Sequence, residues 1–491
     1  MTPPLQLQVR HPGRTLALLA CLSAWATSPL AAQFQTLETG DMRLVYTSPL
    51  QSYLVPQVAR SFENSLRFHR QFWHYDPDGK MEVLMHDLWH YGNAGARPVP
   101  DDHITLGIEP YAHEYESGPA PERMGSSMNH EMAHIFTVDK PTRGDRFYRS
   151  LFFGKVTPNA EAPPSMLYSY LTTPRWYTPR WYLEGIATYM ETWMNGGLGR
   201  AIGPYDEMVF RTMIRDSARI YDLVGLESEG TAIDFQVGVN SYLYGTRFVS
   251  YLALRYGNDS LFAWVNRTPG SRAYFTSQFR KVYGRSLESE WDRWIAWERE
   301  WQRANLDSIR QQPISPVRPI TDRALGSVSR GYYEPASHEL YVAIRYPGQE
   351  AALAAIDVTT GKIRRISTIL GASGFSVTSL AYDPAGRTLF YTTNNADWRH
   401  LWARDLATGH ERKLLHNARI GDLVFDQADR SLWGVRHDNG FSTIVRIPYP
   451  YTKWDQVQTL PYGRDIFDLD VSPDGTTLIG SQGEIDGTLR L

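Results

Sequence analysis

The chain has 491 residues, which is too long for a single domain and predicts two or three. Hydrophobic residues make up 42% of it and aromatic residues 13%, so there is ample material for packed cores. Its 50 lysines and arginines stand against 53 aspartates and glutamates, so the chain lacks the basic balance of a nucleic-acid-binding protein, and we predict no nucleic-acid partner. After the N-terminus no segment reaches the ~18 apolar residues of a membrane helix, so we expect no transmembrane span there.

The N-terminus has the pattern of an export signal. Basic residues at Arg10 and Arg14 precede the apolar stretch Thr15–Ala26, and Ala31-Ala32 offers a small-residue cleavage site before Gln33. We therefore predict that residues 1–32 are a signal peptide and that the protein is exported, to the periplasm or as a secreted protein.

The only cysteine lies inside this predicted signal peptide. Leu18-Leu19-Ala20-Cys21 loosely resembles a bacterial lipobox, so a lipid anchor on Cys21 is an alternative to cleavage after Ala32. The leucine before Ala20 is atypical of a lipobox, and cleavage after Ala32 is favoured. The mature chain would then have no cysteine, and a metal could be held only through nitrogen and oxygen ligands.

The next hundred residues predict strands and one helix in mixed order. We expect strands at Met42–Ser48, Lys80–His86 and His103–Ile108, a helix at Val55–Trp73, and a loop over Asp87–Pro100. The helix has apolar residues at helical spacing, interrupted only where His69 falls. This order is typical of an α+β domain.

The following segment carries the strongest chemical signal of the chain. His130 and His134 are four residues apart, so a helix places both imidazoles on one face, and Glu131 follows the first histidine directly. No proline or glycine interrupts Ser127–Val138. The H-E-x-x-H pattern predicts two zinc ligands and a general base. The alternative is a helix with two buried histidines.

A third ligand is expected on a second helix. Thr137–Leu171 has several glycines and prolines and predicts irregular structure, after which Pro179 is a favourable first-turn residue for a helix that runs to Thr192. Glu184 lies in the second turn of this helix and supplies the carboxylate that a two-histidine zinc site lacks. Gly185 would permit a close helix approach.

The pattern W-x-x-E-G-x-A-x-Y at Trp181–Tyr189, after H-E-x-x-H, resembles the gluzincins, and most closely the bacterial peptidase MA-like group. The resemblance implies a zincin-like fold in which His130, His134 and Glu184 hold one Zn²⁺ and Glu131 activates a water for hydrolysis of a peptide or protein substrate. It also implies that an edge strand, His103–Ile108, lies beside the metal helix and pairs with the extended substrate.

Two more site residues follow from this resemblance. Aminopeptidase-type gluzincins often carry an acid seven positions after the ligand glutamate, which is Glu191 here; it would accept a hydrogen bond from a zinc-bound histidine and orient the ring. Thermolysin-like members instead have an aspartate at the position of Thr188, so the assignment stays open. The exopeptidase motif G-x-M-E-N is absent, so aminopeptidase activity is not implied.

By its offset from Gly245, Tyr242 matches the tyrosine that stabilises the oxyanion in aminopeptidase-type gluzincins, with Tyr244 in reserve. The alternative is a buried tyrosine whose hydroxyl is bonded to backbone. We expect this tyrosine on a helix over Ser241–Leu252. A long helix at Leu287–Arg310 carries a tryptophan stripe that we expect to pack against the peptidase lobe.

Beyond a proline-rich linker at residues 312–320, the composition becomes typical of β-structure. Ile356–Gly361 matches Arg404–Gly409, and Tyr382–Leu389 matches Val471–Leu478. Repeats of this kind are typical of β-propeller blades and resemble the TolB type. Residues 321–491 give room for about three and a half blades at ~40–50 residues each. We therefore predict that the sequence is a fragment of a longer chain, with an open, edge-exposed last sheet.

We thus predict an α+β zincin-like metallopeptidase domain over residues 33–311, followed by an all-β partial β-propeller. Its function would be hydrolysis of peptide bonds by a zinc enzyme, and the propeller could bind a protein partner. The alternative is a periplasmic binding or envelope-assembly scaffold whose peptidase-like lobe is inactive. Turnover of an unstructured protein would distinguish the two.

Overall fold

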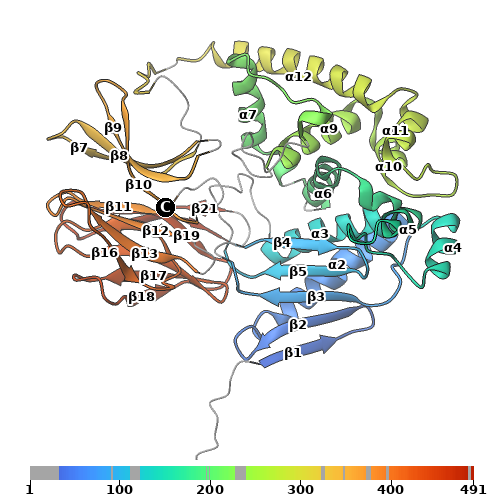
Figure 1. Cartoon of the computed structure of the whole chain (residues 1–491), viewed down its shortest axis with the longest axis horizontal. Coiled ribbons are helices and arrows are strands. Elements are labelled where there is room, and N and C mark those ends of the chain that lie inside the picture. The colour runs from blue at the N-terminus through green and yellow to red at the C-terminus, as the bar shows by residue number, and fades with distance from the viewer. Residues whose placement is uncertain are drawn as a thin grey trace, which may run out of the picture.

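The computed structural model of the chain is shown in Figure 1. It describes residues 33–89, 92–110, 122–194, 196–197, 199–226, 239–313, 315–321, 327–346, 349–371, 378–393, 398–484 and 488–491. The predicted signal peptide, with Cys21, lies outside the described residues. Among the helices that are described, none is long and apolar enough to cross a membrane.

The chain begins with a five-stranded sheet of order β1-β2-β3-β5-β4. Its strands are β1 (Gln33–Glu38), β2 (Met42–Ser48), β3 (Met81–His86), β4 (Ala94–Arg97) and β5 (His103–Gly107). β2, β3 and β5 run parallel, and the outer strands β1 and β4 pair antiparallel with their neighbours. The three strands expected from the sequence are all present.

The strand at the β4 edge of this sheet differs from the edge strand that the sequence predicted. His103–Gly107 is an inner strand, because Ala94–Arg97 pairs with it from within the predicted Asp87–Pro100 loop. The sequence of β4 is Ala-Gly-Ala-Arg, which has no β-branched or aromatic side chain and carries no strand signal of its own. The edge strand beside the metal helix is therefore β4, and the expectation for His103–Ile108 was wrong.

One face of the sheet is buried by two helices. Alternate residues of the inner strands, including Leu44, Val83 and Ile104, are fully buried and share one apolar core with α2 (Val55–Trp73) and α3 (Arg123–Asp139). This period of two is what a sheet covered on one face requires. Helix α2 has the bounds expected from its apolar stripe, and the interrupting His69 is itself fully buried.

The rest of the N-terminal lobe is helical. Its helices are α4 (Arg143–Leu151), α5 (Pro164–Thr172), α6 (Arg180–Met194), α7 (Pro204–Arg215), α8 (Leu223–Leu226), α9 (Val239–Tyr256), α10 (Asn258–Val265), α11 (Phe275–Tyr283) and α12 (Leu287–Ile309), with short 3₁₀ turns η1 (Pro174–Tyr177) and η2 (Arg200–Ile202). The expectation of irregular structure over Thr137–Leu171 was wrong. Thr142 and Asp145 form a capping box that starts α4, and Pro163-Pro164 starts α5.

Helices α6 and α9 cross at two facing glycines. A Cβ on Gly185 would lie 2.4 Å from the carbonyl carbon of Gly245, and a Cβ on Gly245 would lie 2.0 Å from the carbonyl oxygen of Trp181. No side chain fits either position, so the backbones are in direct contact. The close helix approach expected at Gly185 is present, and its partner is α9. Helix α12 packs Trp291 and Trp294 into the same core, while Trp301 is 46% exposed.

After α12 the chain forms four successive antiparallel sheets (Figure 1). The first has β6 (Ser327–Val328), β7 (Tyr332–Glu334), β8 (Glu339–Arg345), β9 (Ala352–Asp357) and β10 (Ile363–Thr368). The second has β11 (Leu380–Asp383), β12 (Thr388–Thr393), β13 (His400–Asp405) and β14 (Glu411–Leu415). The third has β15 (Ile420–Phe425), β16 (Leu432–Asp438), β17 (Phe441–Ile447) and β18 (Asp455–Thr459). The last has β19 (Asp465–Val471), β20 (Leu478–Gly483) and β21 (Leu489–Arg490).

The expected repeat appears as repeated turn geometry. Asp357 accepts from the amides of Thr359 and Thr360 at 2.9 and 2.8 Å, and Asp405, 48 residues later, accepts from Ala407 and Thr408 at 2.8 Å each. The glycine that closes each turn has positive φ, 72° and 75°. Successive sheets join side by side, and the first meets the fourth where the Arg330 guanidinium donates to the carbonyl of Leu469 at 2.8 Å. The C-terminal region is thus sheet-rich and propeller-like.

The two regions meet at a hairpin tip. The turn between β16 and β17 has Asn439 and Gly440 at φ 50° and 81°, which both central positions of a type I′ turn require. The Asp87 carboxylate, which follows β3, accepts from the Asn439 amide at 2.8 Å and from both terminal nitrogens of Arg419 at 2.8 and 2.5 Å. Tyr53 donates to the Asn439 carbonyl at 2.6 Å. We call the N-terminal lobe, from β1 to α12, the helical lobe. The hairpin is therefore bound to the helical lobe through several hydrogen bonds.

Candidate metal site

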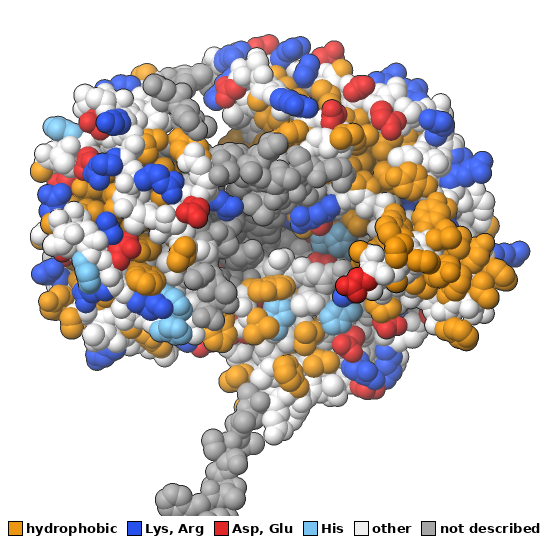
Figure 2. Space-filling view, viewed as in Figure 1, with side chains coloured by type: hydrophobic (Ala, Val, Ile, Leu, Met, Phe, Trp, Pro, Cys, Tyr) orange, Lys and Arg blue, Asp and Glu red, His pale blue; other side chains and the backbone are white. Residues whose placement is uncertain are grey.

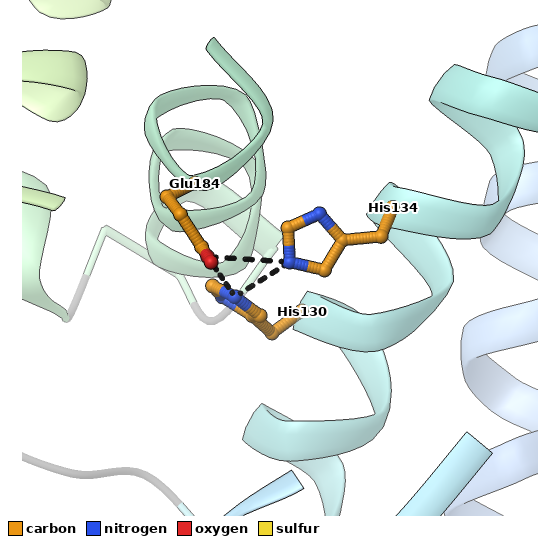
Figure 3. A group of neighbouring side chains, drawn as sticks. All are labelled: His130, His134 and Glu184. Carbon is orange, nitrogen blue, oxygen red and sulfur yellow. Dashed lines mark hydrogen bonds and ion pairs between the residues drawn. The ribbon is translucent and has the colours of Figure 1, made fainter. Parts of the chain in front are cut away.

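Three side chains on two helices converge at the heart of the helical lobe (Figure 3). His130 Nε2 lies 3.1 Å from His134 Nε2 and 3.2 Å from Glu184 Oε2, and His134 Nε2 lies 3.3 Å from that same oxygen. The three donor atoms therefore form a nearly equilateral triangle. Among the described residues this is the group of histidines and acids that could hold a metal ion.

The local sequence explains the convergence. His130 and His134 lie one turn apart on α3, and their rings meet edge to face with centroids 4.7 Å apart. Glu184 lies on α6, which packs against α3, and is 8% exposed. Since Gly185 follows the ligand directly, α6 can press against α9 on one side while Glu184 turns toward α3 on the other.

The pKa values of these side chains depend on the charges of their neighbours. Burial alone would lower the pKa of His130, but the carboxylates of Glu191 and Glu184 outweigh burial and raise that pKa to about 10. Burial would raise the pKa of Glu184, but His134 and His130 hold it well below the usual range. Burial raises the pKa of Glu131, which is 5% exposed. Glu184 is thus ionised in the pH range of most proteins.

The donor set suits zinc. A tetrahedral zinc ion with nitrogen and oxygen ligands at ~2.0–2.1 Å separates its donors by about 3.3–3.4 Å, and the three distances here are 3.1, 3.2 and 3.3 Å. Two imidazoles and one carboxylate match the borderline preference of Zn²⁺, whereas Mg²⁺ and Ca²⁺ prefer shells of oxygen. The residues present therefore fit the ion that the sequence predicts.

Glu191 lies behind the triangle. Its Oε2 is 2.5 Å from His130 Nδ1, so the ring turns its other nitrogen toward His134 and Glu184. A carboxylate at this position fixes both the tautomer and the orientation of a histidine ligand. The neighbouring candidate Thr188 is fully buried and its backbone carbonyl accepts from Thr192. The structure thus places Glu191, and not Thr188, against His130.

Arg200 is a contact that the sequence analysis missed. Its Nε lies 3.2 Å from Glu191 Oε1 and its Nη2 lies 3.4 Å from Oε2, so the guanidinium holds both oxygens of that carboxylate. Burial opposes ionisation of Glu191, but Arg200 and His130 outweigh it and lower its pKa to about 2. The arginine lies in η2, nine residues after Glu191 and beyond the helix, and no motif marks it.

A second arginine lies at the rim. Arg180 Nε is 3.2 Å from the other oxygen of Glu184, at i, i+4 on α6, and the Arg180 side chain is 51% exposed. The guanidiniums of Arg180 and Arg200 lie 5.5 and 4.8 Å from the ring centre of Tyr242. Arg180 could have been found from its spacing to Glu184, because charge pairs four apart on a helix are a recognised pattern.

The two candidate tyrosines face different surroundings. The Tyr242 ring stacks near His130, with centroids 6.1 Å apart. Tyr244 is 1% exposed, its hydroxyl accepts from the Tyr221 amide at 3.2 Å, and its ring packs on Phe210. The structure therefore brings Tyr242 to the metal site and leaves Tyr244 in the aromatic core.

His69 on α2 contacts the backbone of α3, the helix that carries His130 and His134. Trp73 Nε1 donates to His69 Nδ1 at 3.1 Å, so the proton of the neutral ring is on Nε2, which lies 3.3 Å from the Asn129 carbonyl. Burial lowers the pKa of His69 to about 3. A neutral, fully buried imidazole thus links α2 to the residue before His130, which explains the polar interruption in the apolar stripe of α2.

Comparisons with known proteins find no matching protein family and no matching curated protein. Solved structures do match part of the chain. One described as TolB of Agrobacterium tumefaciens is 15% identical over 31% of this chain and 53% of its own, with a TM-score of 0.28. TolB from Acinetobacter baumannii is 13% identical over 33% and 42%, with a TM-score of 0.26. The β-propeller domain of the Trilobed protease from Pyrococcus furiosus is 14% identical over 29% and 45%, with a TM-score of 0.22.

The matched part spans about half the length of these structures. Identities and scores this low say nothing of activity. The propeller-like part of the fold description rests on the four sheets described above. The zincin-like character of the helical lobe, the zinc ion and the peptidase activity stay predictions.

Proposed function

We propose that this protein is a zinc-dependent peptidase. The observation that carries the proposal is the triangle of donor atoms from His130, His134 and Glu184, whose edges match those of a tetrahedral zinc site. When bound there, zinc would polarise the scissile carbonyl and lower the pKa of a water toward ~7. A histidine pair that served only the core would need neither a carboxylate at this distance nor Glu191 behind it.

Glu131 is the general base of the proposed reaction. It follows the first ligand directly on α3 and is buried, and its pKa is raised by that burial, so its carboxylate is a stronger base than an exposed one. It would accept a proton from the attacking water and deliver it to the leaving amine. Glu191 and Arg200 keep His130 in position, and Tyr242 would donate a hydrogen bond to the oxyanion.

The substrate would bind in extended form along β4. Among the strands that the structure describes, β4 pairs with β5 alone, so its other side is the sheet edge, and it lies against α3. An extended peptide can add to such an edge through backbone hydrogen bonds. The role first expected of His103–Ile108 therefore passes to Ala94–Arg97.

Turnover of an unstructured protein, such as reduced casein, tests the proposal. Glu131→Gln should keep the zinc and lower the rate by at least ~10²–10⁴-fold, because an amide cannot accept the proton. Glu161→Gln, at an exposed glutamate outside the metal site, is the matched control and should cleave as the parent does. If Glu131→Gln cleaves at the parental rate, the proposal is wrong. If the parent holds zinc but cleaves nothing, the scaffold alternative stands.

The two tyrosines give a finer test. Tyr242→Phe should lower turnover on the order of 10²–10³-fold with little change in KM, because the lost hydrogen bond forms as charge develops on the oxygen. Tyr244→Phe should leave turnover nearly unchanged. The assignment of Tyr242 fails if Tyr244→Phe alone abolishes cleavage.

A further inference from the structure

Helices α4 and α5, together with the turn that follows α4, expose several large apolar side chains. Phe153 is 99% exposed and Phe147 is 64% exposed. We call the following set the aromatic platform: Phe147, Leu151, Phe153, Met166, Leu167 and Tyr168, each at least 40% exposed. Figure 2 shows it as the large orange area over α4 and α5, at the right. Patches of this kind in soluble proteins mark surfaces that bind something apolar.

The platform is continuous across the two helices. Phe152 stacks on Tyr168 with ring centroids 4.7 Å apart, and Tyr148 lies beside Phe152 at 6.3 Å. The half-buried rings of Phe152 and Tyr148 thus join the exposed side chains of α4 to those of α5. Phe153 has φ 61°, a left-handed conformation that a bulky residue rarely adopts, and it turns its ring fully into solvent.

Helix α4 packs on the lobe with its polar face and turns its apolar face to solvent, the reverse of most amphipathic helices. The residue that it buries is Asp145, which caps the helix and pairs with Arg267. Arg149 also reaches inward, donating to the carbonyls of Thr172 and Asp139 at 2.9 and 2.6 Å. Polar contacts therefore attach the helix to the lobe, and its apolar side chains face out. A core-packing helix would show the opposite.

The exposed charged side chains of α4 are cationic. Residues 143–175 contain five arginines and lysines and two acids. Arg175 is buried, and Arg149 and Lys155 pair with Asp139 inside the lobe, so the exposed charges of this segment are Arg143, Arg146 and Glu161. On α4 itself the acid Asp145 is buried against Arg267, whereas Arg143 and Arg146 are exposed; Glu161 lies beyond the helix. The exposed face of α4 is thus apolar and cationic. Anionic lipid headgroups complement that combination, because guanidiniums pair with phosphates while apolar side chains enter the acyl boundary.

We propose that the aromatic platform binds the surface of an anionic lipid bilayer, so that the protein is held at a membrane through α4 and α5. The phenylalanines would enter the boundary between headgroups and acyl chains, and Arg143 and Arg146 would lie at the phosphates. This inference is independent of the proposed peptidase activity, since it uses no residue of the metal site.

Vesicle flotation tests it with the full chain. Vesicles of phosphatidylethanolamine and phosphatidylglycerol should carry the protein, and phosphatidylcholine vesicles should carry much less. Phe147→Ser/Phe153→Ser should reduce binding at least tenfold. Val224→Ser/Leu254→Ser, which removes two equally exposed apolar side chains elsewhere in the lobe, should bind as the parent does. Any binding through the apolar residues 15–26 is common to all these proteins.

Charge and fold are checked separately. Removing Arg143 or Arg146 by substitution with glutamine should weaken binding to the anionic vesicles about fivefold each and make it less sensitive to salt. Unchanged circular dichroism would show that the serine variant is folded; if it is not, Met166→Ser/Leu167→Ser replaces it. Parental binding by the folded serine variant overturns the proposal. So does self-association that the serines abolish in a chain that no vesicle binds, which would make the platform a homodimer interface.

Discussion

The helical lobe and the propeller-like region use polar side chains in opposite ways. In the lobe, His130 meets Glu184 and Glu191 from 54 and 61 residues away, inside a core where all three are under 9% exposed. In the sheets, Asp405 meets the amides of residues two and three positions on, at the surface. The lobe site therefore depends on how helices distant in sequence pack, whereas each sheet carries its own turns. A single change should spread through the lobe and stay local in the sheets.

The largest effect is expected at the metal ligands. Glu184→Ala leaves two imidazoles without a carboxylate, and His130→Ala removes the histidine that Glu191 contacts. Either change should lower zinc occupancy strongly, because a tetrahedral site with two protein ligands holds zinc poorly. Elemental analysis of the dialysed protein measures this, with Glu161→Ala as the control. Full occupancy in either variant would refute the ligand assignment.

The helix crossing should be nearly as sensitive. In Gly245→Ala the new Cβ would lie 2.0 Å from the Trp181 carbonyl oxygen, so α6 and α9 must separate. We expect a loss of about 3 kcal/mol or more in the free energy of unfolding, at the upper end for overpacking, together with weaker zinc binding as Glu184 moves. Urea unfolding measures the first quantity. Gly40→Ala, with nothing within 4 Å of the new Cβ, is the control and should change stability little.

The buried His69, which contacts α3, predicts that the free energy of unfolding depends on pH. The pKa of His69 is about 3 in the folded chain and ~6.5 when unfolded. Below pH 6.5 the unfolded state binds a proton that the folded state does not, so stability falls as the pH falls from 6.5 toward 3. Between pH 7.5 and 5 this amounts to about 2 kcal/mol. His69→Gln should remove that part of the slope, and His338→Gln, at an exposed position, should not. Equal slopes in all three proteins would contradict the assignment.

Arg200 should have a moderate effect as a positioning residue. Arg200→Ala frees the Glu191 carboxylate, so His130 is held less firmly, and we expect zinc affinity to fall about 10–100-fold, the range for outer-shell partners. Competition with a chelator measures the dissociation constant. Arg200→Lys should recover part of the loss, because one ammonium can still pair with Glu191. Arg215→Ala, which removes an exposed pair with Asp216, should have no effect.

The smallest effect belongs to the sheets. Asp405→Ala removes the acceptor for two amides of an exposed turn, and we expect the melting temperature to fall by a few degrees at most, with zinc content and turnover unchanged. Asp405→Asn keeps an acceptor and should restore the parental value. A large loss of zinc in Asp405→Ala would show that the two regions are not distinct in the way described.

Patterns short enough to lie within one element were predictable. The bounds of α2 follow from its stripe, and the relation of His130 to His134 follows from helical spacing. The turns of Asp357 and Asp405 follow from a shared motif of six residues. In each case the signal and the structure cover the same few residues, and no tertiary contact is needed to interpret them.

Contacts made across elements were harder to predict. β4 is a strand because β5 pairs with it, and its alanines and glycine give no hint of that. Arg200 reaches Glu191 only because the chain turns back after α6. The helices α4 and α5 were missed for a different reason: prolines and glycines were interpreted as loop, although the Thr142–Asp145 spacing is a capping box and Pro164 is in a first turn, both of which are helix signals.

The hairpin tip at Asn439 has a thermodynamic consequence. Asp87 is the common acceptor for Arg419 and for the Asn439 amide, and Arg419 is only 7% exposed. If the helical lobe melts alone, Arg419 loses the bidentate pair with Asp87 and of its ion pairs keeps only the longer one with Asp438, which lowers the stability of the third sheet. The unfolding of the helical lobe and the unfolding of the third sheet are thus coupled, because neither region can unfold without breaking the hydrogen bonds of Asp87.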